Sequence, residues 1–130
     1  MIFSLLQDLG VLGGDVRVRR YFYKAIWPTS PRDFIMCSSS RELPDGSILM
    51  STISPPSGMY PEKDGYVRAH INISGMHLKP VDKKFGGGCA ITMIGHSDLK
   101  GNLPSSILNM LSVGMPTKVM TKLKKVLESR

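Results

Sequence analysis

Glycine and proline interrupt the first hundred residues of the chain so often that only short extended segments fit between them. The sequence holds 13 glycines and 9 prolines among 130 residues, and most of them precede residue 102. Glycine adopts backbone angles that other residues avoid, and proline lacks the N–H group that helices and sheets require. A chain divided in this way favours strands joined by turns over long helices.

The segments between these breakers are rich in β-branched and aromatic residues, and several alternate between apolar and polar side chains. Pro44-Asp45-Gly46 is a turn signature, so residues 33–54 are predicted to form a hairpin. Gly75 is predicted to turn the chain, and residues 55–61 are predicted to form a loop because their prolines cannot pair in a sheet. We predict strands over residues 2–7, 16–27, 33–41, 47–54, 66–74, 76–81 and 89–95.

From Leu103 onward the apolar residues recur at intervals of three and four, which predicts an amphipathic helix. Gly114 and Pro116 predict a break or kink in it. Strands followed by a helix indicate an α+β protein, in which an antiparallel sheet is covered by the helix. One side of the helix carries Leu111, Met115, Val119 and Leu123, and the polar side carries Lys118, Lys122, Lys124 and Lys125.

The composition is that of a globular protein, with 42% hydrophobic and 21% charged residues. Such values exclude wholesale disorder, and the length suits one domain. No apolar run approaches the ~20 residues of a membrane-spanning helix, and the first residues do not resemble a secretory signal. Cys37 and Cys89 have neither metal-ligand spacing nor a disulfide framework. We therefore expect a cytoplasmic protein.

Motifs of catalysis are absent from the sequence. Phosphate-binding loops, nucleophile elbows, zinc-protease helices and paired cysteines have no match. Phe85-Gly86-Gly87-Gly88 lacks the lysine and the following helix of a phosphate cradle, so we interpret it as a turn. The histidines lack metal-ligand spacing. Arg32 and Asp33 are interpreted as structural residues, which form either a partly buried ion pair or hydrogen bonds that anchor the start of the strand. The sequence predicts no enzyme, no cofactor and no metal site.

The basic balance indicates anionic partners. Lys and Arg together number 17 against 10 Asp and Glu, which leaves a net charge of +7. Residues 17–24 combine arginines with aromatic residues, so a basic module that binds nucleic acid or protein is the alternative hypothesis. Alternation places Tyr21 and Tyr23 with Arg17 and Arg19, which favours a solvated strand face and no nucleic-acid partner.

Arg20 departs from this pattern. Strict alternation places it with Val18 and Phe22 on the apolar face of the strand. A buried arginine requires an anionic partner, and a lipid phosphate in a cavity is one such partner. A bulge at Arg19-Arg20 would instead return the side chain to solvent. The residues alone leave both interpretations open.

Four segments resemble, in order, landmarks of the START lipid-transfer domain. They are Trp27-Pro28-Thr29-Ser30-Pro31-Arg32-Asp33-Phe34, Asp45-Gly46-Ser47, Pro61-Glu62-Lys63-Asp64-Gly65-Tyr66-Val67-Arg68-Ala69, and Ser97-Asp98-Leu99-Lys100-Gly101-Asn102-Leu103-Pro104. The resemblance covers the C-terminal two-thirds of such a domain. It predicts that residues 1–130 form a single, N-terminally truncated lipid-binding domain with the helix-grip fold, a curved antiparallel sheet that grips the C-terminal helix.

The family resemblance implies a non-enzymatic module that holds one lipid in a tunnel between sheet and helix, and transfers or senses it. The segment from Pro55 to Asp64 corresponds to the family's lid. A fragment without ligand-binding capacity is a further alternative. The residues expected to line the lipid cavity are Arg20, Asn72, Met93, Leu111, Met115, Val119 and Leu123. The residues expected to contact an anionic membrane are Met59, Tyr60, Lys118, Lys122 and Lys125.

The subclass most similar in motif is the ceramide-carrier branch. Trp27-Pro28-x-Ser30 and Val67-Arg68-Ala69-His70-Ile71-Asn72 resemble its segments, and Asn72 stands where that branch contacts the head group. Pro31 and Met93 stand where the branch has glutamine and tyrosine, so a sphingolipid, a phospholipid and a sterol all remain open. Because the opening strands of the domain are missing, we also expect an exposed sheet edge that pairs with a second copy.

Overall fold

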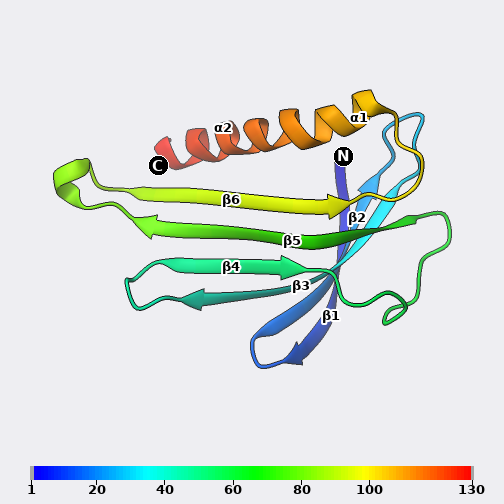
Figure 1. Ribbon diagram of the computed structural model, residues 1–130, viewed down its shortest axis with the longest axis horizontal. Helices are drawn as coiled ribbons and strands as arrows, with labels where there is room; N and C mark the ends of the chain where they lie inside the picture. Colours follow the sequence, from blue (N-terminus) through cyan, green and yellow to red (C-terminus); the bar gives the residue numbers. More distant parts are fainter. Residues whose placement is uncertain (1, 130) are drawn as a thin grey trace. The chain divides into compact units, whose positions relative to one another are not determined.

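The computed structural model describes residues 2–129, which fall into two compact units (Figure 1). The first unit spans residues 2–100 and is a β-sheet, and the second begins at Gly101 and is helical. Each unit is described by itself. None of the helices in residues 2–129 combines the length and the apolar character needed to cross a membrane.

Six strands form one sheet in which each strand pairs with its neighbour in the sequence, all antiparallel. The predicted antiparallel sheet and the hairpin over residues 33–54 are thereby confirmed. In Figure 1, β1 and β2 lie at a steep angle to β5 and β6, so the sheet is strongly twisted. The strands are β1 (Ile2–Gly13), β2 (Val16–Lys24), β3 (Arg32–Glu42), β4 (Ile48–Ile53), β5 (Val67–Pro80) and β6 (Cys89–Asp98).

One glycine was misread as a chain turn. The predicted turn at Gly75 is wrong, because β5 continues through it and pairs it with Ser51 on one side. A Cβ at this position would lie 3.2 Å from the Met50 carbonyl oxygen, so glycine allows a close approach of strands here. Gly10 lies within β1, next to a register irregularity, and β1 therefore extends well beyond the predicted residues 2–7.

The helical unit is continuous across the predicted break. Its segments are α1 (Ser105–Asn109), a π-helical turn (Met110–Gly114) and α2 (Met115–Glu128). The irregularity predicted at Gly114 and Pro116 takes the form of this π-helical turn. Pro116 follows this turn at the start of α2, and its missing N–H cannot donate to a carbonyl of the preceding turn.

The short strand β4 creates a junction that organises the site. β4 ends at Ile53, and beyond it β5 lies directly beside β3, with Arg32–Phe34 paired in parallel to Val67–Ala69. The Ser54 hydroxyl closes the junction, because it donates to the Ile35 carbonyl and accepts from the Ile71 N–H, each at 2.9 Å. The first residues of β3 thus have strand neighbours on both sides and are buried.

The apolar core of the sheet unit lies on β2 and β3. Val18 and Ile35 are each 1% exposed and form a cluster with Cys37. The Tyr60 ring, from the loop between β4 and β5, packs against this cluster. We call residues 54–66 the covering loop, because they cover the face of β2 and β3 that carries this core.

Candidate functional site

A fully buried carboxylate lies at the junction of β3 and β5. Asp33 is 0% exposed, and its strand position faces Arg68 of β5. The Arg68 guanidinium donates from Nε to Oδ1 at 2.9 Å and from Nη2 to Oδ2 at 2.8 Å. This paired geometry is among the strongest that a carboxylate forms with a side chain. The carboxylate of Asp33 is therefore satisfied within the sheet.

Arg20 brings a second guanidinium to the same carboxylate. Its Nε lies 3.4 Å from Asp33 Oδ2, and its side chain is only 12% exposed. The predicted placement of Arg20 on the apolar face is confirmed, and its register with β3 is unbroken from Arg17 to Tyr23, so the bulge suggested at Arg19-Arg20 is wrong. The anionic partner that a buried arginine requires is Asp33. One negative and two positive charges leave this cluster with a net charge of +1.

The two guanidiniums also hold the covering loop. Arg68 donates from Nη1 to the Tyr60 carbonyl at 3.2 Å and from Nη2 to the Pro61 carbonyl at 2.9 Å. Arg20 Nη2 donates to the same Pro61 carbonyl. We call Arg20, Asp33, Arg68 and these two carbonyl groups the arginine latch. Through the latch, a loop that is rich in proline is fixed to the sheet by side chains of β2 and β5.

The predicted ion pair between Arg32 and Asp33 is wrong. Adjacent residues of a strand point to opposite faces, so the two side chains cannot meet there. Arg32 is 3% exposed and donates instead to backbone carbonyls, to Ser30 at 2.5 Å, Leu99 at 3.3 Å and Lys100 at 2.9 Å. Burial lowers the pKa of its guanidinium from the ordinary value. The structural role predicted for this pair of residues stands, with different partners.

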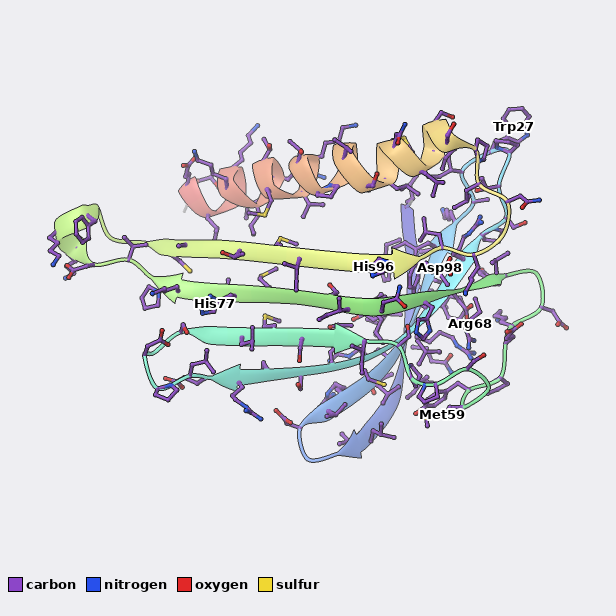
Figure 2. All side chains as sticks on the ribbon, in the orientation of Figure 1. Trp27, Met59, Arg68, His77, His96 and Asp98 are labelled. Carbon is purple, nitrogen blue, oxygen red and sulfur yellow. The ribbon has the colours of Figure 1, made fainter. Side chains whose placement is uncertain are left out.

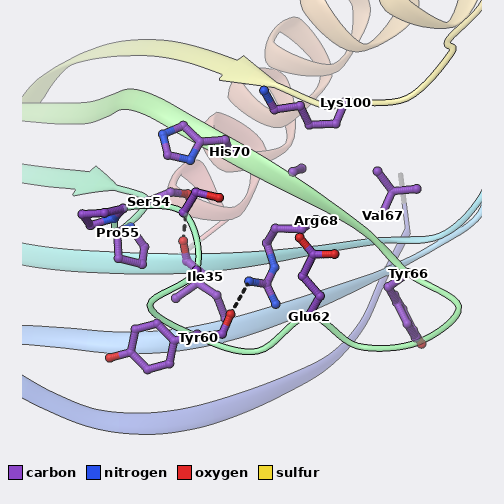
Figure 3. A pocket seen from close by; sticks show the side chains of 14 residues that line it. Ile35, Ser54, Pro55, Tyr60, Glu62, Tyr66, Val67, Arg68, His70 and Lys100 are labelled. Carbon is purple, nitrogen blue, oxygen red and sulfur yellow. Dashed lines mark hydrogen bonds between the residues drawn. The ribbon is translucent and has the colours of Figure 1, made fainter.

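A cavity of about 600 Å³ lies between the covering loop and strands β3 and β5 (Figure 3). Figure 3 shows the Arg68 side chain in its wall, with a dashed line to the Tyr60 carbonyl. The volume falls within the range of pockets that hold small molecules. Its lining includes Ile35, Tyr60, Glu62, Arg68, His70 and Lys100.

Basic groups predominate in this wall. Arg68 and Lys100 are cationic, His70 lies beside them, and Glu62 is the acidic residue in the wall. Lys100 Nζ also lies 2.7 Å from the Asp98 carboxylate. Hydrogen bonds from the Lys100 side chain, and then from its backbone, hold the pKa of Asp98 below its ordinary value. The cavity is suited to a polar or anionic group that accepts hydrogen bonds.

Two residues of the sheet that were predicted to contact lipid, Asn72 and Met93, lie outside the wall of this cavity. Asn72 is exposed and sits at the irregularity of β5 where the register with β6 shifts between Ile71 and Ile73. Met93 pairs with Met76 of β5 and is 43% exposed. The structure therefore does not bring Asn72 and Met93 together, and neither is among the residues that line the cavity.

The two residues predicted at the membrane have different surroundings. Met59 lies near the middle of the covering loop and is 50% exposed (Figure 2). The neighbouring Tyr60 is half-buried, because its ring packs against the core of the sheet unit. In the helical unit the predicted lysines Lys118, Lys122 and Lys125 are exposed, and Val119 is 46% exposed, while Leu111, Met115 and Leu123 are half-exposed.

A second buried polar group joins a turn to β5. The Ser47 hydroxyl is fully buried, donates to the Asp45 carboxylate at 2.5 Å and lies 2.9 Å from His77 Nε2. The hydrogen bond from the Ser47 side chain is the main cause that lowers the pKa of Asp45. Because its proton is directed to the carboxylate, Ser47 is a structural link of the hairpin.

Sequence reasoning missed Arg68 as a partner of Asp33, and it missed His70 and Lys100 in the cavity wall. Alternation along a strand puts Arg68 and His70 on one face, but it does not identify the strand that lies opposite. The parallel contact between β3 and β5 joins residues 35 positions apart, and no local pattern predicts it. Only the resemblance to the family's V-R-A segment drew attention to Arg68.

Comparison with known proteins assigns a family to this arrangement. A START domain family model matches residues 6–129. The structure of human STARD10 has a TM-score of 0.80 and 25% identity over 95% of this chain and 49% of that chain. Human StAR-related lipid transfer protein 5 has a TM-score of 0.79 and 22% identity over 98% of this chain and 61% of that chain.

A bacterial structure has the same fold. The StAR-related lipid transfer protein of Xanthomonas axonopodis, fragment 25–204, has a TM-score of 0.71 and 22% identity over 97% of this chain and 68% of that chain. No curated protein matches the sequence significantly. The chain spans 49% of STARD10 and 61% of StAR-related lipid transfer protein 5. Strands and helix together reproduce the elements of the helix-grip fold, which confirms the predicted fold class.

Removing the carboxylate of the latch is expected to destabilise the protein strongly. The change Asp33→Ala leaves two buried guanidiniums without their counter-ion, and breaking a buried pair in this way costs about 3–5 kcal/mol. Asp8→Ala is the matched control, because the Asp8–Arg17 pair is about half exposed and such pairs contribute about 0–1 kcal/mol. Urea unfolding measures both changes. Equal stability of the two variants would contradict a stabilising role of the buried carboxylate.

Proposed function

Because the chain belongs to the START domain family, we propose that it binds a single lipid and transfers it between membranes or senses it. The observation that carries the proposal is the cavity of about 600 Å³ beneath a loop held by the arginine latch. Two of the solved relatives are themselves named lipid transfer proteins. A pocket of this size with convergent polar groups is typical of a site for a small molecule.

The polar end of the ligand is proposed to lie beneath the covering loop. Arg68, His70 and Lys100 in the cavity wall donate hydrogen bonds to oxygen atoms of a lipid head group. Arg20 contributes to lipid binding by holding the Pro61 carbonyl, and thus the cover of the site. Asn72 and Met93 lie outside this cavity, and they are proposed to contact the part of the lipid that extends beyond it.

The apolar part of the ligand is proposed to contact the helical unit. Burial of each methylene group contributes about 0.8 kcal/mol, so two acyl chains supply most of the binding free energy. The apolar residues of the helix that serve this purpose are Leu111, Met115, Val119 and Leu123. This role follows from their spacing in the sequence and from the family.

The class of lipid is left open between a sphingolipid, a phospholipid and a sterol. The resemblance to the ceramide-carrier branch supports a sphingolipid through Asn72 alone. Organic extraction of the purified chain followed by mass spectrometry identifies the lipid. We expect one lipid class at about one molecule per chain, whereas a chain free of lipid after exposure to vesicles would support a fragment without binding capacity.

The alternative of a nucleic-acid or protein-binding strand has less support. Arg17 pairs with Asp8, and Arg20 pairs with Asp33. Half of the basic residues of β2 thus contact carboxylates of the same sheet, and the strand is not a row of free cations. These contacts favour a role for the basic residues within the domain over a surface for polyanions.

A charge in the apolar stripe of α2 is expected to abolish lipid retention. Leu123→Asp places a carboxylate where an acyl chain is proposed to lie, and an unpaired charge in apolar surroundings is costly. The control is Thr121→Asp, an exposed position two residues earlier on the same helix. Lipid content by mass spectrometry and the melting temperature are measured together. Unchanged lipid content in Leu123→Asp would remove α2 from the proposed site.

The covering loop is proposed to be the membrane gate, and the chain to associate peripherally with membranes in the cytoplasm. Met59, near the middle of the loop, is proposed to enter the bilayer interface, with Tyr60 beside it. The lysines of α2, at positions 118, 122 and 125, are attracted to anionic head groups. The two contributions respond differently to salt, because screening weakens only the charge attraction.

Replacing the exposed loop residue is expected to weaken vesicle binding equally at all salt concentrations. Met59→Ser removes apolar surface without disturbing the core, whereas Met59→Ser/Tyr60→Ser also removes the ring that packs on the cluster of Val18 and Ile35. Val11→Ser, at a 58% exposed position of β1, is the control. Co-sedimentation with anionic vesicles over a salt series tests this. If Met59→Ser binds like the control, the loop is not the gate.

A second copy of the chain is proposed to pair with the edge strand β6. The other edge, β1, carries three register irregularities that disturb pairing. From Cys89 to Ser97, by contrast, β6 has no lysine, arginine, carboxylate or proline. Uninterrupted edges of this kind recruit further strands.

A charge on this edge is expected to return the chain to a monomer. Ile94→Lys adds a cation at a 57% exposed position of β6, and Val11→Lys adds the same charge to β1 as a control. Light scattering coupled to size exclusion is expected to show twice the mass of one chain for the parent and the control, and a single chain for Ile94→Lys. A monomeric parent at high concentration would contradict the proposal.

A further inference from the structure

The hairpin that joins β5 to β6 ends in an ordered, basic tip. The last pair that β5 forms with β4 is Leu78 with Ile48, and beyond it β5 pairs only with β6, up to Pro80 and Cys89. We call residues 79–88 the hairpin tip. Figure 1 shows this tip projecting beyond the ends of β3 and β4, at the opposite end of the sheet from the covering loop.

Hydrogen bonds fix the conformation of the hairpin tip. The Asp82 carboxylate accepts from the Lys84 N–H at 3.0 Å and begins a single 3-10 turn over Lys83–Phe85. Backbone bonds from Gly86 to Lys83 at 3.0 Å and from Gly87 to Asp82 at 3.1 Å complete it. The glycines from 86 to 88 have φ angles of 100°, 69° and 92°, which other residues rarely adopt. The tip therefore presents its side chains in a defined arrangement.

An aromatic ring stands exposed at the end of this turn. Phe85 is 75% exposed, and the Lys84 ammonium lies 5.0 Å from the centre of its ring. Water does not favour an exposed phenyl ring, so its placement on a rigid projection calls for a partner that buries it. The sheet itself provides no such contact.

The charge around the ring indicates the chemistry of that partner. Lys79 and Lys83 are exposed, and the Lys84 side chain is 69% exposed. Against these three cations stands only the Asp82 carboxylate, whose side chain is 58% exposed and lies 3.9 Å from Lys84 Nζ. The hairpin tip thus has a net charge of +2 and one apolar ring. An apolar residue flanked by lysines is the pattern of a segment that lies in the interface of an anionic bilayer.

We propose that the hairpin tip docks on an anionic lipid bilayer, with Phe85 in the interface and the three lysines against anionic head groups. The proposal rests on the proposed lipid function, since exchange of lipid requires contact with a bilayer. It adds a second membrane contact that involves neither the covering loop nor the lysines of α2. Contact through the tip brings β5 and β6 end-on to the membrane.

Vesicle co-sedimentation with two variants tests the proposal. Phe85→Ala removes the ring and Lys83→Gln/Lys84→Gln removes two charges, and all three positions are too exposed to affect folding. Phe3→Ala, at a 52% exposed ring of β1, is the control for the first, and Lys24→Gln/Arg41→Gln is the control of equal charge for the second. The probes are vesicles of phosphatidylcholine alone and of phosphatidylcholine with phosphatidylserine.

The expected changes are specific to each variant. Phe85→Ala weakens partitioning to serine-containing vesicles about tenfold at every salt concentration, because interfacial burial of a phenyl ring is lost. The double lysine change weakens it about fivefold per lysine at low salt and has little effect at high salt. Neither change alters the melting temperature. Both controls bind like the parent.

A fluorescence experiment locates the tip directly. The chain has one tryptophan, so Trp27→Phe/Phe85→Trp carries its single indole at the hairpin tip. Its emission is expected to shift to shorter wavelength with serine-containing vesicles and to remain unchanged with phosphatidylcholine alone. Absence of the shift would overturn the proposal.

Failure of the proposal and failure of the lipid function give different results. If the parent carries a lipid but Phe85→Ala binds vesicles like Phe3→Ala, the tip is not a membrane contact and the lipid function stands. If extraction finds no lipid but Phe85→Ala still loses vesicle binding, the tip docks on membranes and the lipid function fails. A Phe85→Ala chain that changes from dimer to monomer, without a change in vesicle binding, would identify the tip as an interface between copies and overturn the proposal.

Discussion

The arrangement of β2, β3 and β5 depends on the interaction of the buried Asp33 carboxylate with the guanidiniums of Arg20 and Arg68. An isolated carboxylate in such a place would be protonated or would destabilise the fold, but the paired hydrogen bonds from Arg68 and the nearby positive charge of Arg20 compensate its lost hydration. The same guanidiniums are drawn into the sheet only because the carboxylate is there. Neither half of the cluster is stable without the other, so β2, β3 and β5 are tied together at one point.

The geometry of the strands explains why the candidate site lies beside this point. Because β4 is short, β3 and β5 meet directly, and the chain between them leaves the sheet as the covering loop. The guanidiniums have donors left over after binding Asp33, and these donors reach the carbonyls of Tyr60 and Pro61. Tyr60 and Pro61 lie outside the strands, so their carbonyl groups take no part in the sheet and can accept hydrogen bonds from side chains. These hydrogen bonds hold the covering loop over the strands, and the cavity is the space between the loop and the strands.

Local pattern predicted the elements of the fold but not the contacts between them. Alternation along β2 correctly placed Arg20 among apolar residues and so required an anionic partner, but that partner lies on another strand and no periodicity identifies it. Gly75 was misread because a glycine between two extended segments is compatible both with a turn and with a close approach of neighbouring backbones. Only the structure shows that the Met50 carbonyl lies beside it. The covering loop was predictable from its prolines, whereas His70 and Lys100 joined its cavity through the pairing of β5 with β6. The family landmarks drew attention to Arg68, which alternation did not, because their order and spacing in the sequence reflect contacts between distant segments of the fold.

The arrangement of the latch also constrains how the covering loop can open. The bonds between Arg68 and Asp33 lie within the sheet and do not involve the loop, so they persist when the loop moves. Opening breaks the hydrogen bonds to two backbone carbonyls and withdraws the Tyr60 ring from the core. Water can replace the carbonyls as acceptors for guanidinium donors that become exposed. Hydrogen bonds to charged groups contribute about 1.5–3 kcal/mol each, so these bonds favour the closed loop without making it permanent. The buried ion pair thus keeps the sheet rigid, and the weaker bonds to Tyr60 and Pro61 allow the cover of the cavity to move.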